Sequence, residues 1–227
     1  MTMEVRFLGH ACFTLSDGGS TTVLIDPFLS DNPKGAIAAE DVDATTILLT
    51  HGHHDHLGDT VAIAKRTGAT VVAITEIAGE LGQEGVDVRD PNLGGTEKFD
   101  WGTVKLVPAL HTSTTPNGTV TPPAGLLINF QDTVVYHLGD TCLFSDLALV
   151  GKRTPIDIAL MCIGGHYTMD RTDAVEAASL IGAKTVIPCH FNTFPAIETD
   201  AQAFKSDVES ATSSNVVILE PGDTHTT

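Results

Sequence analysis

Strand and helix patterns alternate along this chain in an order that few folds can accommodate. Short strand patterns separated by turns open the sequence, and a strand-helix-strand-helix segment follows them. A second group of strands then leads into another alternating segment. Strands are predicted at residues 5–8, 12–15, 23–25, 47–49, 70–74, 86–88, 104–107, 126–130, 134–136, 156–162, 185–187 and 216–219, and helices at residues 60–67, 76–83, 172–181 and 200–211. This alternation favours an α/β fold in which helices pack on layered sheets.

Length and composition fit one globular unit. The chain has 227 residues, of which 42% are hydrophobic, enough to build a sizeable core. No linker or low-complexity tract divides it, so we expect a single domain over residues 1–227. The polar, proline-bearing loop at residues 112–123 is the best candidate for a mobile lid.

Charge and cysteine usage exclude several classes of protein. Lysine and arginine number 12 against 29 acidic residues, a formal charge of −17, which disfavours nucleic-acid binding. The N-terminus lacks a signal-peptide pattern, and the longest apolar run, residues 158–163, falls far short of the ~18 residues of a membrane span. The four cysteines show no CxxC spacing, so we expect reduced thiols in a cytoplasmic protein that binds neither nucleic acid nor membrane.

The densest chemical signal lies at residues 51–56, where four histidines and one aspartate occur within six positions. In extended chain His51 and His53 point the same way, because side chains alternate, so both can reach one cation. Asp55 and His56 then open a helix and face a neighbouring position, whereas His54 alternates away from His53 and is expected to point outward. One segment can therefore serve two metals through nitrogen and oxygen ligands.

Three further candidates, His111, Asp140 and His190, each lie just past a predicted strand. Loops at strand ends converge in layered α/β folds, so these residues are expected to join the histidine-rich segment. Asp26, in the Ile25-Asp26-Pro27 turn, has two interpretations. It either caps the turn or accepts a hydrogen bond from a ligand histidine.

The chain resembles the metallo-β-lactamase superfamily over nearly its whole length. The resemblance is carried by an HxHxDH motif followed, in this order, by an isolated histidine, Gly-Asp-Thr and a last histidine. The resemblance implies an αββα sandwich with a two-metal site at one edge of the sheets. It assigns His51, His53 and His111 to the first metal. Asp55, His56 and His190 go to the second metal, and Asp140 bridges the two. The phrases at residues 8–13, 25–28, 137–141 and 164–169 are similar to the small metal-dependent hydrolases related to L-ascorbate-6-phosphate lactonase.

The resemblance implies a hydrolase in which a metal-bridging hydroxide cleaves a small ester, lactone or phosphoester, with Asp55 orienting the bridging water. The metals would be two divalent ions, zinc first, with manganese, nickel or iron as alternatives. The expected partner is a small-molecule substrate, and the chain is expected to form a homo-oligomer. Two alternatives stay open: a mono-iron or di-iron redox or sulfur-dioxygenase-like enzyme of the same fold, and a metal-holding structural or sensor protein.

His10 and His166 are left over from the ligand set. Each follows an apolar run and a glycine, which allows the backbone to approach a ligand closely. Both are therefore predicted to be catalytic residues that orient the substrate or pass a proton. The alternative for each is a loop histidine satisfied by backbone groups.

Overall fold

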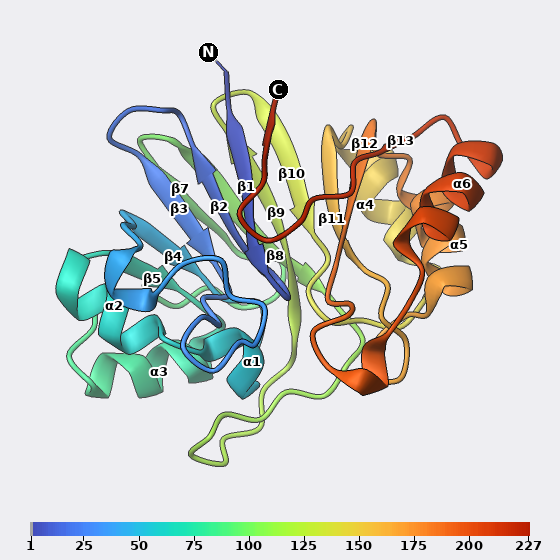
Figure 1. The fold of residues 1–227 in the computed structure, drawn as a ribbon. Coiled ribbons are helices and arrows are strands. Elements are labelled where there is room, and N and C mark those ends of the chain that lie inside the picture. Colours follow the sequence, from blue (N-terminus) through green and yellow to red (C-terminus); the bar gives the residue numbers. More distant parts are fainter. Residues whose placement is uncertain (1) are drawn as a thin grey trace.

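The computed structural model describes residues 2–227, and its strands form two seven-stranded sheets (Figure 1). The strands are β1 (Glu4–Gly9), β2 (Cys12–Ser16), β3 (Thr22–Ile25), β4 (Thr46–Leu48), β5 (Thr70–Val72), β6 (Val88–Arg89), β7 (Thr96–Phe99), β8 (Gly102–Pro108), β9 (Ala124–Phe130), β10 (Thr133–His137), β11 (Ile158–Cys162), β12 (Thr185–Cys189), β13 (Asn215–Val216) and β14 (Thr224–Thr226). The helices are α1 (His54–Leu57), α2 (Thr60–Thr67), α3 (Thr75–Gln83), α4 (Leu147–Arg153), α5 (Arg171–Ile181) and α6 (Ala201–Ala211), with 3-10 turns η1 (Ala39–Asp41) and η2 (Pro195–Ile197).

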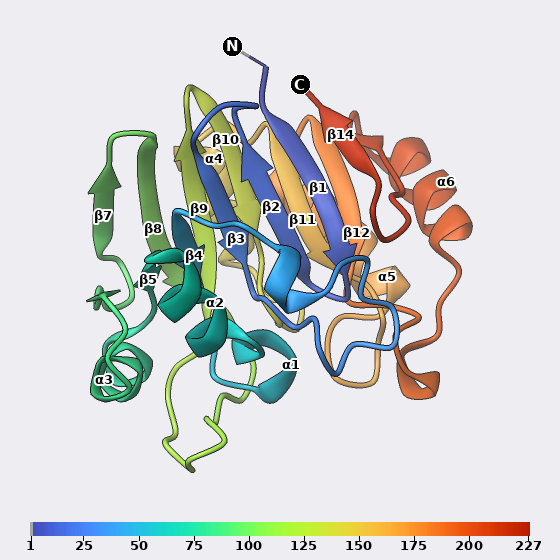
Figure 2. The same cartoon turned by 60° about the vertical axis from the view of Figure 1, so that its left-hand side comes forward.

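The first sheet has the strand order β14-β1-β2-β3-β4-β5-β6. Strands β1, β2 and β3 pair antiparallel, whereas β3 to β6 run parallel. Parallel neighbours need crossover connections, and here α1 and α2 connect β4 to β5 while α3 connects β5 to β6. These helices lie along the outer side of the sheet (Figure 2).

The second sheet has the order β13-β12-β11-β10-β9-β8-β7 and repeats the same plan. Strands β7 to β10 pair antiparallel, and β10 to β13 run parallel. The crossovers α4, α5 and α6 form one group beside this sheet (Figure 1).

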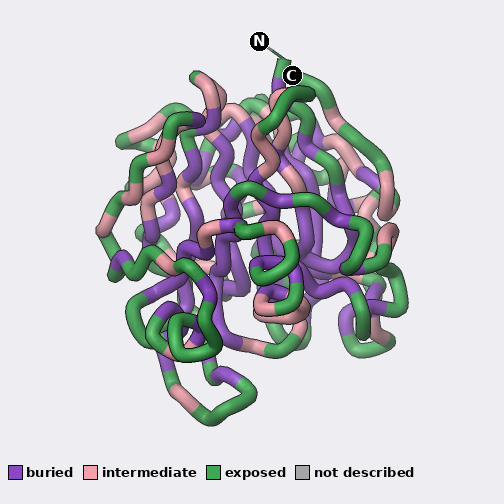
Figure 3. Tube along the Cα trace, turned by 90° about the vertical axis from the view of Figure 1, so that its left-hand side faces the viewer, coloured by how far each residue is buried: buried purple, intermediate pink, exposed green. Residues whose placement is uncertain are grey.

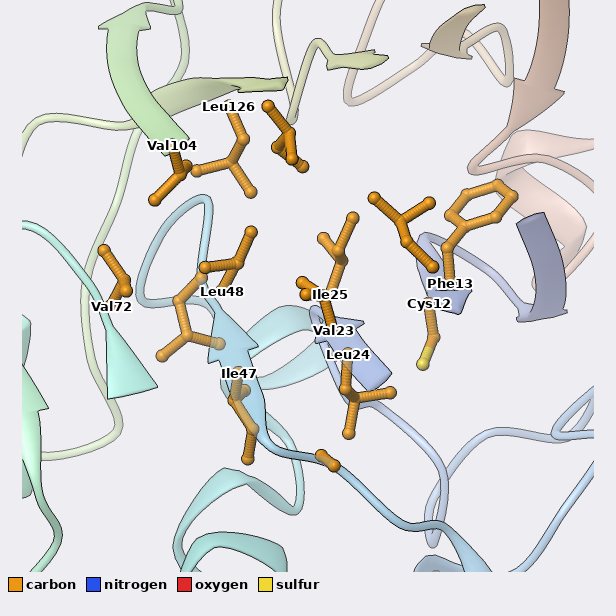
Figure 4. Packing of buried hydrophobic residues seen from close by; sticks show 14 of the residues in the cluster. Cys12, Phe13, Val23, Leu24, Ile25, Ile47, Leu48, Val72, Val104 and Leu126 are labelled. Atoms are coloured by element: carbon orange, nitrogen blue, oxygen red, sulfur yellow. The ribbon is translucent and has the colours of Figure 1, made fainter. Parts of the chain in front are cut away.

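The largest hydrophobic core lies between the sheets. Phe13 and Ile25 of the first sheet and Leu126 of the second belong to this one cluster, and all three are fully buried (Figure 4). Along β9, Leu126 belongs to this core, whereas its neighbour Leu127 packs against a second cluster that α5 and α6 cover. The tube view shows the buried strands enclosed by exposed loops and helix faces (Figure 3). The expected αββα sandwich is confirmed.

The structure also contains elements that the sequence patterns did not predict: α4, β7 and the terminal strand β14. Strand β7 alternates between exposed and half-buried residues at the sheet edge, and β14 pairs with β1, which brings the two chain ends together (Figure 1). The predicted strand over residues 216–219 is shorter, since only Asn215–Val216 pairs. Among the described residues, no helix combines the length and apolarity needed to cross a bilayer.

The loop at residues 112–123 is attached at its base and along one side. The Ser113 hydroxyl accepts from the Gly52 N–H at 3.0 Å, and Thr115 donates to Glu80 of α3 at 2.9 Å. Val120 is 76% exposed in this loop. Its motion as a lid stays a prediction.

Candidate metal centre

The candidate ligands come from loops that follow four strands. His51 and α1 lie after β4, His111 after β8, Asp140 after β10, and His190 directly after β12. These loops meet at the lower edge of the sheets in Figure 1, close to α1. Both sheets therefore contribute to one site, which is how distant segments of an α/β sequence converge.

Three histidines form the first cluster, the group that the resemblance assigns to the first metal. Their ligand atoms, one each from His51, His53 and His111, lie within 4.8 Å of one another. The His51 Nε2 atom is 3.0 Å from His53 Nδ1. His51 is fully buried, whereas the other two are half-buried and reach the cavity.

The second cluster contains Asp55, His56 and His190, and Asp140 lies between the two clusters. One Asp140 oxygen is 3.3 Å from His56 Nε2. Its other oxygen lies 3.1 Å from His190 Nε2 and 3.6 Å from His111 Nε2. The carboxylate therefore faces ligands of both clusters, the position expected of a bridge.

Asp26 and Thr50 hold the histidines from behind. Asp26 accepts from the Thr50 N–H (2.9 Å), the Thr50 hydroxyl (2.6 Å) and His56 Nδ1 (2.7 Å). The Thr50 hydroxyl in turn accepts from His51 Nδ1 at 3.0 Å. With both Nδ1 atoms engaged, the Nε2 atoms of His51 and His56 are left to face a metal. This contact pattern favours the second of the two interpretations of Asp26. Thr50 was not singled out from the sequence, although its place directly before His51 was a usable signal.

His10 joins the second cluster instead of the cavity wall. Its side chain is fully buried, with Nε2 3.1 Å from Asp55 and Nδ1 2.8 Å from the Thr193 hydroxyl. Its carbonyl accepts from the His190 N–H at 2.6 Å. His10 therefore contacts a candidate ligand through its ring and another through its backbone, and it does not line the cavity above the clusters.

Burial and charge set four of these groups in the protonation states that divalent cations require. His56 differs: burial lowers its pKa, but the Asp140 and Asp26 carboxylates outweigh burial and raise that pKa well above the usual value, so a metal must displace its proton. Burial lowers the pKa of His51 well below its usual value, and it lowers the pKa values of His53 and His111 as well. Burial raises the pKa of Asp140, but the imidazoles of His190 and His56 outweigh it and leave that pKa well below normal. Three neutral imidazoles and an ionised carboxylate are a suitable ligand set.

Unpaired buried nitrogens support the fit to a metal. Nε2 of His56 and both ring nitrogens of His190 are buried without a well-aligned hydrogen bond, although the two Nε2 atoms lie within 3.3 Å of Asp140 oxygens. Such orphaned polar atoms are costly unless something else binds them. A divalent cation at each cluster would satisfy the Nε2 atoms with nitrogen and oxygen ligands alone, which suits zinc and its neighbours.

Strained backbone brings the site together. His10, Asp26 and His190 all have left-handed φ values, of 58°, 45° and 54°. This conformation is uncommon for residues other than glycine and concentrates at functional sites. Gly139 (φ 65°) leads into Asp140, and a Cβ there would lie 2.6 Å from the Ala124 carbonyl oxygen, so only glycine fits.

A cavity of about 730 Å³ opens above the clusters. Its floor includes His53, Asp55, His111, Asp140 and His190. His166 is exposed and does not line it, but its ring lies edge-on against Tyr167, which does, at a centroid distance of 4.4 Å. His54 is exposed, as the alternation of side chains predicted, and it also lines the cavity; its Nε2 atom lies 3.1 Å from Asp31.

The fold and the donor set define a metal-binding αββα protein, and comparison with known proteins gives its family. The model of the beta-lactamase superfamily domain matches residues 4–190, so the chain belongs to this superfamily. It is 45% identical to a UPF0173 metal-dependent hydrolase of Bacillus mycoides, covering 99% of both chains. It is 42% identical to one of Natranaerobius thermophilus, covering 97% of this chain and 98% of that one.

A solved structure agrees with these relatives. Igni18, a metallo hydrolase of the archaeon Ignicoccus hospitalis, superposes with a TM-score of 0.91 at 36% identity, covering 100% of this chain and 99% of the other. The chain is therefore a metal-dependent hydrolase of the beta-lactamase superfamily. The expected relation to ascorbate-6-phosphate lactonase stays a prediction.

Proposed function

We propose that this protein is a binuclear metal-dependent hydrolase that cleaves a small ester, lactone or phosphoester. The observation that carries the proposal is the Asp140 carboxylate, whose two oxygens lie within 3.6 Å of His56, His111 and His190. A carboxylate between two ligand clusters is suited to hold two cations close together. We take zinc as the resident metal, with manganese, nickel or iron as alternatives.

His51, His53 and His111 would hold the first ion, and Asp55, His56 and His190 the second. Bound divalent ions supply a nucleophile at neutral pH, by lowering the pKa of water to about 7, and polarise the scissile oxygen. Asp26 and Thr50 fix the ring orientation of the ligands, so little reorganisation is needed when substrate binds.

Asp55 faces both the cavity and His10. Burial raises the pKa of Asp55, but the hydrogen bond from His10 and the charge of His56 outweigh burial. The pKa therefore lies below its usual value, and the carboxylate stays ionised. We propose that His10 positions Asp55, which orients the attacking water as a hydrogen-bond acceptor. This role differs from the substrate contact expected from the sequence, because the His10 ring is buried behind Asp55. His166 keeps its proposed role near the leaving group, through its contact with Tyr167 at the cavity.

The redox alternative is less well supported by the ligand set. The two clusters together contain five histidines and two carboxylates, so nitrogen ligands outnumber oxygen ligands, most clearly at His51, His53 and His111. The proposal also includes the cytoplasmic location and homo-oligomeric state expected from the sequence. All four cysteines are free, which suits a reducing compartment.

A hydrolysis screen of the zinc-, manganese-, nickel- and iron-loaded protein tests the proposal. The panel contains aryl esters, lactones and phosphodiesters, and His53→Ala serves as the ligand-deficient control. We expect turnover that depends on added metal and falls by at least about 10²-fold in the control. No turnover of any substrate with full metal occupancy would favour a metal-holding sensor instead.

A further inference from the structure

The cavity has two chemically different parts. The candidate ligands form its polar floor, whereas its wall consists mainly of aromatic and small apolar side chains. These wall residues are Phe28, Tyr167, Phe194, Pro195 and Ala196. They come from the loop after β3, the loop after β11 and the turn η2, so both sheets contribute to the wall.

Within the described residues the wall includes two neutral hydroxyl-bearing side chains, Thr112 and Tyr167, but no lysine or arginine that could pair with an anion. The chain has twelve lysines and arginines, and within residues 2–227 none of them lines this cavity. His54 is the basic side chain on the wall, and Asp31 already pairs with it at 3.1 Å. An anionic substituent would therefore lose hydration against apolar surface without gaining a charged hydrogen bond, within a protein of net charge −17.

Backbone contacts hold two of the aromatic residues in place. The Phe28 carbonyl accepts from the side-chain amide of Asn32 at 3.0 Å. The Asp59 carboxylate accepts from the backbone N–H groups of residues 29 and 30, which follow Phe28. The Phe194 carbonyl accepts from the Ile197 N–H at 3.0 Å. The two rings lie 6.4 Å apart and inclined at 45°, so they form one fixed aromatic surface.

We propose that the part of the substrate remote from the scissile bond is uncharged and apolar or aromatic, and that Phe28, Tyr167 and Phe194 select it. The inference rests on the proposed hydrolase activity and narrows its substrate class. It excludes substrates that carry a phosphate or carboxylate away from the reacting bond. A volume of about 730 Å³ is within the usual range for a small-molecule site.

A matched pair of esters tests this selection. 4-Nitrophenyl hexanoate and the mono-4-nitrophenyl ester of adipate share the leaving group and chain length, but the second ends in a carboxylate. For the metal-loaded protein we expect kcat/KM to be at least about 10-fold higher for the hexanoate. Equal values, or a preference for the adipate, would overturn the proposal.

Variants of the wall locate the preference. Phe194→Ala should raise KM for the hexanoate by about 10-fold with unchanged metal content. Phe144→Ala is the matched control, because Phe144 is also half-buried but does not line the cavity. Ala196→Arg should shift the preference toward the adipate by supplying the missing cation. If neither Phe194→Ala nor Ala196→Arg changed the ratio of kcat/KM for the hexanoate to that for the adipate, the assignment of substrate selection to this wall would be overturned.

A binding measurement gives a readout without turnover. The uncharged fluorophore N-phenyl-1-naphthylamine and its sulfonate analogue 8-anilino-1-naphthalenesulfonate differ mainly in charge. We expect the uncharged probe to bind the metal-loaded protein more tightly, and Phe194→Ala to weaken it. If neither ester is hydrolysed, the broader panel of esters, lactones and phosphodiesters decides the hydrolase proposal, and the fluorescence result alone decides the selectivity. Tighter binding of the sulfonate than of the uncharged probe, or equal binding of the uncharged probe to the wild type and Phe194→Ala, would overturn the inference.

Discussion

Asp26 shows how a single buried side chain determines the chemistry of its neighbours. Its two oxygens accept from three donors, two on Thr50 and one on His56. From the sequence this role was one of two interpretations of the Asp26-Pro27 turn. The burial of His10 could not be predicted, because it depends on the left-handed turn after β1 and on Thr193, 183 residues away.

Replacing Asp26 by asparagine should weaken binding of one metal ion by about 10- to 100-fold. The amide nitrogen would replace either the oxygen that accepts from the Thr50 N–H or the oxygen that accepts from both the Thr50 hydroxyl and His56, so at least one donor would lose its acceptor. Metal titration followed by calorimetry measures the affinity. Asp31→Asn is the control. Asp31 pairs with the exposed His54, so its replacement should leave the metal affinity unchanged. Equal metal affinities for the two variants would show that Asp26 does not orient the ligand histidines.

The elements that hydrophobic patterns define were predicted well, and those that pairing defines were not. Helix α2 and strands β2 and β9 contain runs of apolar residues with clear periodicity, and the structure places them close to the predicted bounds. Edge strand β7 has no buried residue, so its sequence carries little signal. Strand β14 exists because β1 offers it a partner, which a local pattern cannot indicate.

The attachment of the loop at residues 112–123 to the metal site should contribute to stability. Removing the Ser113 hydroxyl leaves the buried Gly52 N–H without its acceptor. Ser113→Ala should therefore lower the free energy of unfolding of the metal-free protein by about 1–3 kcal/mol. Urea denaturation measures this loss, with the exposed Ser145→Ala as control. A loss no larger than that of the control would show that the attachment is dispensable.

Asp157 joins three strands at the edge opposite the site, accepting from the Val134 N–H (2.8 Å) and the Lys184 ammonium (2.7 Å). Burial raises the pKa of Asp157, but these donors outweigh it and the pKa lies below its usual 3.8. Its contribution is therefore complete above pH 3.8 and is lost as pH falls through the lower folded pKa.

Asp157→Asn should accordingly lower the free energy of unfolding near neutral pH by about 1 kcal/mol, a modest value because Lys184 is exposed. The difference from the wild type should shrink as the pH drops below 3.8. Denaturation curves across this range provide the test. A difference that stays constant with pH would show that ionisation of Asp157 is not involved.

At the scale of the whole molecule, the two sheets share the site. The first sheet supplies the histidine-rich segment after β4, and the second supplies His111, Asp140 and His190. The order of motifs in the sequence was sufficient to predict this convergence and the αββα sandwich. The apolar wall of the cavity was not predicted, because its residues come from three separate loops without a shared motif.

Metal removal should destabilise the entire fold, because ions bound at the proposed site would link the two sheets. At a free metal concentration 1,000 times the dissociation constant, one site contributes about 4 kcal/mol to the free energy of unfolding. We expect a chelator to lower the melting temperature of the metal-loaded wild type and to have little effect on Asp140→Ala. If complete metal removal left the melting temperature of the wild type unchanged, metal binding at this site would not stabilise the fold.

The number of ions bound per chain tests the binuclear centre most directly. After reconstitution with zinc and removal of excess metal, elemental analysis should give about two ions per chain for the wild type. Asp140→Ala should lose more metal than His53→Ala, because the carboxylate faces both clusters whereas His53 serves one. At most one ion in the wild type with every metal tried, or full occupancy of Asp140→Ala, would contradict the bridged two-metal site.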